Sequence, residues 1–159
     1  MNDYKTILAT KGYFVTNIVG TSMFPMLRQG KDTVLLKPID RTIKKYDVVL
    51  FQRDKGKYVL HRVLKANNGA YIICGDNQYK KEYTIKDHNM IAIMAVFYRK
   101  ERYVSIDNFW YKLYSRLVSL FRPFVFLKFM FIKFFRKRGT KSWTMILKQQ
   151  LPLPWEQPL

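Results

Sequence analysis

Hydrophobic and polar residues form short runs over the first hundred residues, with turn residues between them. The runs rich in Val, Leu, Ile, Phe and Tyr are strand candidates, and they cover residues 33–39, 47–53, 57–64, 70–75 and 90–99. RQGKD, RDKGK, ANNG and GDNQ separate them and are typical of turns. Residues 3–11 are expected to form a short helix closed by Gly12. Because helices do not alternate with the strands, the pattern predicts a mainly β fold, a small barrel or sandwich.

The pattern changes after about residue 105, where polar residues recur at offsets of three and four. They are Lys112, Ser115, Arg116, Ser119 and Arg122, and aromatic and aliphatic residues surround them. This period predicts an amphipathic helix, capped by Asp107 or Asn108 and broken or kinked at Pro123. A second amphipathic helix is expected after Pro123. The chain thus divides into a β-rich domain (1–104), a basic, aromatic helical segment (105–148) and a proline-rich tail (149–159).

Composition narrows the classes of partner and cofactor. The 159 residues carry a net charge of +18, which favours an anionic partner. A single cysteine excludes a disulfide framework and a zinc cluster, and no cofactor or metal is expected. The N-terminus lacks the pattern of a secretory signal, and no run of about 18 residues is free of charge. The expected location is cytoplasmic or peripheral to a membrane.

Ser22, His61 and Asp76 are the residues from which a nucleophilic site can be assembled. A serine nucleophile needs a base, a group that orients the base, and donors for the oxyanion. His61 lies within the strand candidate KYVLHRVL, where alternation puts Val59, His61 and Val63 on one face. Asp76 follows at a strand-to-turn junction. The same residues also fit a turn hydroxyl, a packed histidine and a turn former, so the residues alone leave both interpretations open.

Four stretches in one order, GTSMFPML, KKYDVVLF, KYVLHRVL and CGDN, resemble the boxes of the signal peptidase I and repressor-autoprotease superfamily. The resemblance implies a signal peptidase-like β-barrel or sandwich that hydrolyses peptides through an acyl-enzyme. It assigns Ser22 as nucleophile, with its backbone N–H in the oxyanion hole, and Met23 and Pro25 as the residues that shape the turn. His61 stands where bacterial signal peptidases have a lysine base, and Asp76 matches the aspartate of the Ser-His branch.

The chain departs from the superfamily pattern at two backbone positions. Tyr46 stands where glycine usually precedes Asp47, and Gly20 has no hydroxyl to assist an oxyanion. The membrane anchor that precedes the serine box in signal peptidases is not found among the 21 residues before Ser22.

The function expected from the resemblance is a serine endopeptidase that cleaves a peptide or a leader or signal sequence with Ser22, His61 and Asp76. One alternative is a DNA-linked autoprotease. The net positive charge favours it, but no helix-turn-helix domain is found. Another is a non-catalytic relative that binds peptide, membrane or nucleic acid. The expected partner is a peptide or pre-protein substrate, and nucleic acid is not expected.

Residues 108–138 leave a further alternative open, between packing on the β domain and attachment to an anionic membrane surface. Lys128 and Lys133 interrupt the apolar run, which disfavours a span across the bilayer. Aromatic and basic residues interleave, which is typical of helices lying in the interface. The cations expected to face phosphate groups are Lys112, Arg116, Arg122 and the cluster Arg136, Lys137 and Arg138.

Overall fold

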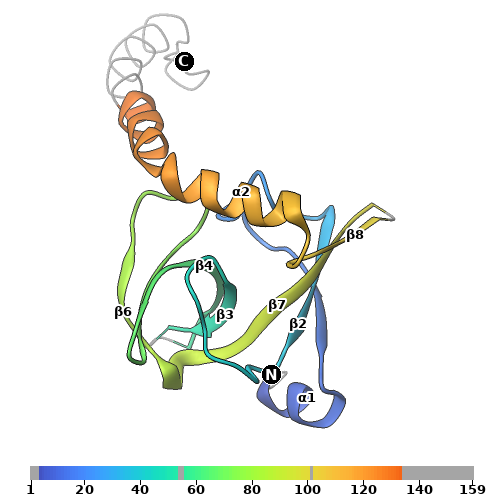
Figure 1. Cartoon of the computed structure of the whole chain (residues 1–159). Coiled ribbons are helices and arrows are strands. Elements are labelled where there is room, and N and C mark those ends of the chain that lie inside the picture. Colours follow the sequence, from blue (N-terminus) through green and yellow to red (C-terminus); the bar gives the residue numbers. More distant parts are fainter. Residues whose placement is uncertain (1–3, 54–55, 101, 134–159) are drawn as a thin grey trace, which may run out of the picture.

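The computed structural model describes residues 4–53, 56–100 and 102–133. Helix α1 (Tyr4–Lys11) is followed by eight strands, a 3-10 turn and helix α2 (Phe109–Leu120) (Figure 1). The strands are β1 (Phe14–Asn17), β2 (Asp32–Lys37), β3 (Val48–Gln52), β4 (Tyr58–Asn67), β5 (Ala70–Cys74), β6 (Glu82–Lys86), β7 (Met90–Arg99) and β8 (Arg102–Ser105). The 3-10 turn η1 (Asp87–Asn89) joins β6 to β7, and residues 122–133 are helical.

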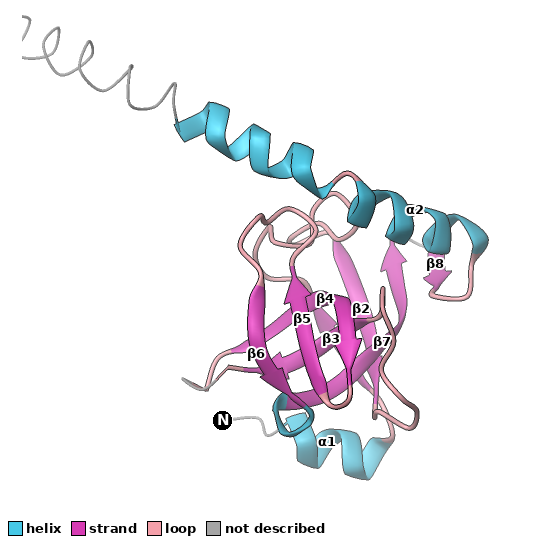
Figure 2. Cartoon of the chain, turned by 60° about the vertical axis from the view of Figure 1, so that its left-hand side comes forward, coloured by secondary structure: helices cyan, strands magenta, loops and turns pink. Residues whose placement is uncertain are grey.

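The eight strands form one antiparallel sheet with the order β1-β2-β7-β3-β4-β5-β6, and β8 pairs with β7. Register shifts interrupt the β2–β7, β3–β7, β4–β5 and β5–β6 pairs. Such irregularities bend strands. Figure 2 shows the sheet curled around itself, with α1 and α2 at opposite ends of the β body. The mainly β fold predicted from the sequence is therefore confirmed.

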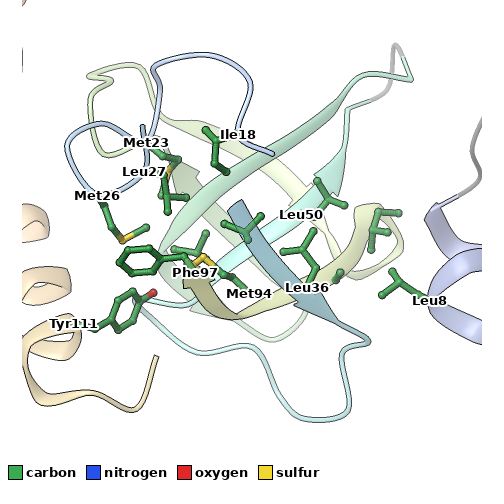
Figure 3. Packing of buried hydrophobic residues seen from close by; sticks show 14 residues of the cluster. Leu8, Ile18, Met23, Met26, Leu27, Leu36, Leu50, Met94, Phe97 and Tyr111 are labelled. Atoms are coloured by element: carbon green, nitrogen blue, oxygen red, sulfur yellow. The ribbon is translucent and has the colours of Figure 1, made fainter. Parts of the chain in front are cut away.

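Two apolar clusters fill the β body. The larger one includes Met23, Met26 and Leu27 from the turn that carries Ser22, together with Leu36 and Met94 from the sheet (Figure 3). The smaller one gathers Val49, Phe51, Val63, Ile73 and their neighbours. Because its apolar side chains are sunk into the larger cluster, the serine turn is anchored to the core.

Most predicted elements are present, with three omissions. The N-terminal helix, its closure at Gly12 (φ +70°) and the five strand candidates are confirmed. Strands β1, β6 and β8 were not predicted, because they are short and carry mixed polarity.

The predicted helix boundaries after residue 105 are also confirmed. The side chain of Asn108 caps α2, accepting from the N–H of Trp110 at 2.8 Å and of Tyr111 at 3.4 Å. Helix α2 ends at Leu120, and Pro123 lies in the first turn of the next helical stretch, where its missing N–H costs little.

The helical segment does not include a membrane span within its described part. None of the helices in residues 4–53, 56–100 and 102–133 combines the length and apolarity needed to cross a bilayer. The basic cluster at residues 136–138 and the predicted tail at 149–159 lie outside the described residues.

Candidate active site

Ser22 sits in a tight turn whose shape depends on its neighbours. Gly20 enters the turn with φ +86°, a conformation that glycine adopts without strain. Met23 is buried beneath the turn, and its carbonyl accepts a 2.9 Å hydrogen bond from the N–H of Leu27. Pro25 lies exposed in the same turn. The turn therefore holds Ser22 directly above side chains that are fixed in the apolar core.

His61 is held in the middle of β4, with only 1% of its surface exposed. Its Cα pairs with Val49 of β3, and its ring centroid lies 6.0 Å from that of Phe51. A strand histidine fixed by such neighbours has little rotational freedom, so its ring nitrogens point in defined directions.

Gly75 shows that Ser22 and His61 meet. A Cβ placed on Gly75 would lie 2.6 Å from the carbonyl oxygen of Ser22, 3.0 Å from the Ser22 Cβ and 3.1 Å from His61 Nε2. Real Cβ atoms are not found at the shortest of these distances. Glycine at this position thus permits the serine turn, β4 and the loop after β5 to approach one another.

Glu82 binds the other nitrogen of the His61 ring. The distance from His61 Nδ1 to Glu82 Oε1 is 3.0 Å. The sheet register explains this contact, because Glu82 pairs with Ile73, and Ile73 pairs with Val63. Val63 is two residues from His61 on the same face of β4. Glu82 is therefore on the sheet face of His61, two strands away.

The Glu82 carboxylate is held in its charged form. Burial opposes ionisation, but hydrogen bonds from His61 and from Arg53 outweigh it and lower the pKa of Glu82 to about 2. Arg53 donates through Nε at 2.7 Å and through Nη2 at 2.8 Å. An ionised carboxylate only accepts hydrogen bonds, so His61 Nδ1 must carry the proton. In the neutral ring, Nε2 is then an acceptor on the side of Ser22.

Asp76 does not take the place predicted for it, so its assignment as the group that orients His61 is corrected. Its two carboxylate oxygens each accept a 2.8 Å hydrogen bond from Arg62. Tyr114 of α2 adds a bond of 3.3 Å from its hydroxyl. Arg62 follows His61 in β4 and therefore points to the other face of the strand. The Asp76 carboxylate consequently binds a side chain on the face of β4 opposite to His61.

Arg62 and Asp76 form a buried ion pair that fastens α2 to the β body. Arg62 also donates to the Tyr46 carbonyl at 2.9 Å and to Ser115 Oγ at 2.8 Å. Burial disfavours its charge, but the Asp76 carboxylate prevails and raises the pKa of Arg62 above its ordinary value. Arg62 is thus a structural residue, and its side chain is fully buried.

The loop after β5 is held from two sides. The N–H of Asn77 donates to the Ser22 carbonyl at 2.8 Å, and its side chain donates to the Thr21 carbonyl at 3.3 Å. From the helical segment, Arg122 Nη1 donates to the carbonyls of Gly75 at 3.3 Å and Gln78 at 3.0 Å. The position of the Ser22 turn thus depends on contacts from both the β body and the helices.

Tyr46, which stands where the resemblance led us to expect glycine, adopts a backbone conformation that favours glycine. Its φ is +80°, in the left-handed region that side chains disfavour. Its N–H donates to the Val63 carbonyl at 2.8 Å, while its own carbonyl accepts from Arg62. The turn before β3 is therefore retained, with tyrosine in a strained position.

The remaining candidate residues lie away from the Ser22–His61 pair or are inert. Cys74 is buried, and burial raises the pKa of its thiol, although the nearby Arg122 charge opposes this. His88, the second histidine of the chain, is part of η1. Among the described residues, no three His, Cys, Asp or Glu side chains converge in a way that would hold a metal ion.

A cleft of about 390 Å³ opens beside Ser22 and His61. Apolar side chains from α1, β1 and β4 form part of its wall, among them Tyr4, Phe14 and Tyr58. The Tyr4 ring packs edge-on against Phe14 and Tyr58, with centroids 4.9 Å and 4.5 Å away. Strand β1 ends the sheet order, so its outer edge is free of a sheet partner among the described strands. The cleft thus has a partly apolar wall, and β1 contributes to that wall.

Comparison with known proteins agrees with this geometry. The profile of the family described as Peptidase S24-like matches residues 3–97. The chain belongs to this family, and the matched region contains the Ser22 turn, His61, Gly75 and Glu82. No curated protein matches the chain significantly in sequence. Family membership supports a peptidase-type hydrolase or autoprotease-like function in general terms.

Proposed function

We propose that the protein is a serine endopeptidase in which Ser22 is the nucleophile, His61 the base and Glu82 the residue that orients the base. The observation that carries this proposal is the convergence at Gly75, where a Cβ placed on the glycine would lie 3.0 Å from the Ser22 Cβ and 3.1 Å from His61 Nε2. The 3.0 Å contact of Nδ1 with Glu82 supplies the third member of the arrangement. The three side chains come from a turn, β4 and β6.

The proposed mechanism follows from these contacts. Ser22 Oγ attacks the carbonyl carbon of the scissile peptide while its proton passes to His61 Nε2. The imidazolium then gives that proton to the leaving amine, and an acyl-enzyme on Ser22 remains. Water attacks the ester with His61 again as base, and the product acid is released. The backbone N–H of Ser22 is assigned to the oxyanion, as the superfamily resemblance implies.

Glu82 contributes by staying anionic throughout this cycle. A carboxylate with a pKa of about 2 keeps Nδ1 protonated and stabilises the imidazolium when it forms. Arg53 holds the second side of the same carboxylate, so Glu82 is itself fixed in place. A histidine base also avoids the desolvation that a lysine base requires for action near neutral pH.

The proposed substrate is an extended peptide, such as a leader or signal sequence, with apolar residues near the scissile bond. An extended peptide can pair with the free edge of β1 and place alternate side chains in the cleft. Phe14 and Ile18 flank this edge, and both line the cleft with Ser22.

The experiment that tests the function compares cells making the natural chain with cells making Ser22→Ala. Mass spectrometry of small peptides should show uncut precursors only in the Ser22→Ala cells. Intact mass of the purified chain, recorded over hours, separates cleavage of another peptide from self-cleavage. Identical peptide profiles in the two strains, together with an unchanged intact mass, would refute the proposed activity.

A further inference from the structure

The helical segment carries a long run of exposed apolar side chains, of which Phe126 also contacts the ring of Tyr79. The exposed fractions are 72% for Trp110, 42% for Leu117, 70% for Leu120, 51% for Phe121 and 64% for Phe124. Trp110, Leu117 and Leu120 are spaced by seven and three residues and so share one face of α2, whereas Phe121 and Phe124 follow where α2 ends and the next helical stretch begins. Residues 126–132 continue the exposure with Phe126, Leu127, Met130, Phe131 and Ile132. We call these ten residues the apolar stripe.

Helix α2 turns a different side toward the β body. Tyr111 and Ser115 are buried there, and Ser115 accepts from Arg62 at 2.8 Å. Figure 2 shows α2 across the end of the β body, with the helical residues up to 133 running past its edge. The same helix therefore packs on the β body with one face and exposes apolar side chains on another. Packing and attachment to a membrane surface are thus compatible.

A basic pocket lies where the helical segment meets the β body, beside the stripe. It encloses about 640 Å³, and its lining includes Lys45, Lys81, Arg116 and Arg122. No carboxylate is among the described residues that line it. Leu120 of the apolar stripe forms part of the same wall. The pocket thus joins four cations to an apolar rim.

Arg122 is the unusual member of this basic pocket. It is 8% exposed, and its Nη1 donates to the carbonyls of Gly75 and Gln78. Its Nε and Nη2 are buried, and within the described part of the chain neither has a hydrogen-bond partner. Burying such donors unpaired is unfavourable. Guanidinium donors match phosphate oxygens in geometry and charge, so a phosphate in the pocket would satisfy them.

We propose that the basic pocket binds the phosphate of an anionic lipid headgroup while the apolar stripe enters the outer layer of that membrane. One amphiphile satisfies both features, because its phosphate and its acyl chains are joined. In this arrangement the helical segment contacts the membrane surface, the β body lies beside that surface, and the described residues do not cross the bilayer. This inference depends on exposure and charge, and not on the proposed catalysis.

Charge and shape favour a lipid over two other occupants. A second copy of this chain would bring a further net charge of +18 to a face already rich in cations. A nucleic acid would pair with the cations, but it would leave aliphatic side chains such as Leu117, Leu127 and Ile132 in water. A membrane surface with anionic headgroups complements the cations and covers the apolar side chains.

The test is co-sedimentation of the full chain with phosphatidylglycerol vesicles and with phosphatidylcholine vesicles. A Ser22→Ala background keeps the result independent of peptidase activity. The stripe variant is Leu120→Gln with Phe124→Gln, and its control is Tyr103→Gln, an aromatic residue 70% exposed on β8. The pocket variant is Lys45→Glu with Arg116→Glu, and its control is Lys37→Glu, an exposed cation on β2.

Phosphatidylglycerol vesicles should bind the parent chain and both controls equally. Each double variant should bind at least about tenfold more weakly, because it loses apolar burial or several charge contacts. High salt should weaken the parent and shrink the effect of the pocket variant, since screening acts on exposed charges. Circular dichroism and thermal melts establish that the variants are folded.

Several results would overturn the proposal. Equal binding by a folded double variant and its control would show that the stripe or the basic pocket takes no part. Absence of vesicle binding by the parent chain would also overturn the proposal. This holds whether sedimentation velocity then shows self-association or a monomer. A third result would identify a soluble anion as the ligand. In that case the parent chain binds inorganic phosphate or a DNA duplex but not vesicles, and Lys45→Glu with Arg116→Glu abolishes that binding.

Discussion

At the scale of single residues, Glu82 shows what the sequence hides. In the stretch KKEYTIK it resembles a solvated charge on a surface strand, whereas Asp76 stands in a box that points to catalysis. The structure reverses their partners, since Glu82 binds His61 and Asp76 binds Arg62. Only the register of β4, β5 and β6 reveals this, and a single sequence does not contain that register. Ser22 and His61 could be proposed from the sequence because motif and strand alternation are local signals.

The Glu82 carboxylate should contribute to stability in a pH-dependent way. Its pKa is about 2 in the folded chain and near 4.3 in an unfolded one. The contribution is therefore complete above about pH 5 and is lost as the pH falls toward 2. Allowing for solvent at a side chain that is 20% exposed, it amounts to about 2 kcal/mol.

Urea unfolding of the parent and of Glu82→Gln at pH 6 and at pH 2.5 measures this contribution. The free energies of unfolding should differ clearly at pH 6 and by a much smaller amount at pH 2.5, because Glu82 begins to take up its proton as the pH approaches its pKa of about 2. A difference of equal size at the two pH values would show that the charge of Glu82 is not involved.

Gly75→Ala should impair the site more than the fold. The added methyl would meet the Ser22 carbonyl at 2.6 Å and His61 Nε2 at 3.1 Å, so the serine turn has to move. We expect acylation of Ser22 to slow by about 100-fold, as small misplacements of reacting groups do. The control is Gly12→Ala, which has open space but φ +70° and lies outside the site. It should lower the melting temperature without slowing acylation. A Gly75→Ala chain that reacts at the parental rate would contradict the convergence described here.

At the scale of elements, long apolar strands were predictable and short mixed ones were not. β3 and β7 have four and five consecutive buried residues, which no loop within residues 4–53, 56–100 and 102–133 matches. β8 has two exposed and two partly buried residues, and depends on its pairing with β7 rather than on its own pattern. The helix period of α2 was clear, but the face it buries was not, because that face is only partly apolar: Tyr111 joins the larger apolar cluster, whereas Ser115 accepts a hydrogen bond from Arg62.

Asp76→Asn should loosen α2 from the β body. The substitution leaves Arg62 as a buried charge without a counter-ion, which costs about 3–5 kcal/mol. Hydrogen exchange should show early loss of protection in α2, and urea unfolding should give the size of the effect. Asp107→Asn is the matched control, since its pair with Lys112 is 85% exposed on the aspartate side and should change stability by less than about 0.5 kcal/mol. Equal effects of the two substitutions would mean that the buried pair does not secure the helix.

Tyr46→Gly tests the strained turn before β3. A side chain at φ +80° costs about 1–2 kcal/mol, and glycine removes that cost while adding flexibility to the unfolded chain. The net result should be a gain of up to about 1 kcal/mol in the free energy of unfolding. Tyr58→Gly, in the interior of the sheet, is the control and should lower the free energy of unfolding. A loss of stability in Tyr46→Gly would show that its side-chain contacts outweigh the strain.

At the scale of the whole molecule, one network connects the helical segment to the reactive serine. Arg122 donates to the carbonyl of Gly75, and Gly75 lies so close to Ser22 and His61 that an added Cβ would meet both. Asp76, the next residue, is tied to α2 through Arg62 and Tyr114. The sequence indicated a β domain and a separate helical segment, whereas the contacts make the first turns of that segment part of the support for the site.

The central claim is that His61, oriented by Glu82, activates Ser22, and the rate of acylation by a fluorophosphonate probe tests it most directly. Peptide mapping should place one adduct on Ser22 in the parent and none there in Ser22→Ala. The rate should fall at least about 1,000-fold in His61→Ala and about 100-fold or more in Glu82→Gln, because members of such a triad act together. Folded Asp76→Asn, assayed in the cold, should keep a rate within about tenfold of the parent. An adduct on a different residue, or a Glu82→Gln chain that reacts at the parental rate while folded Asp76→Asn does not, would contradict the account.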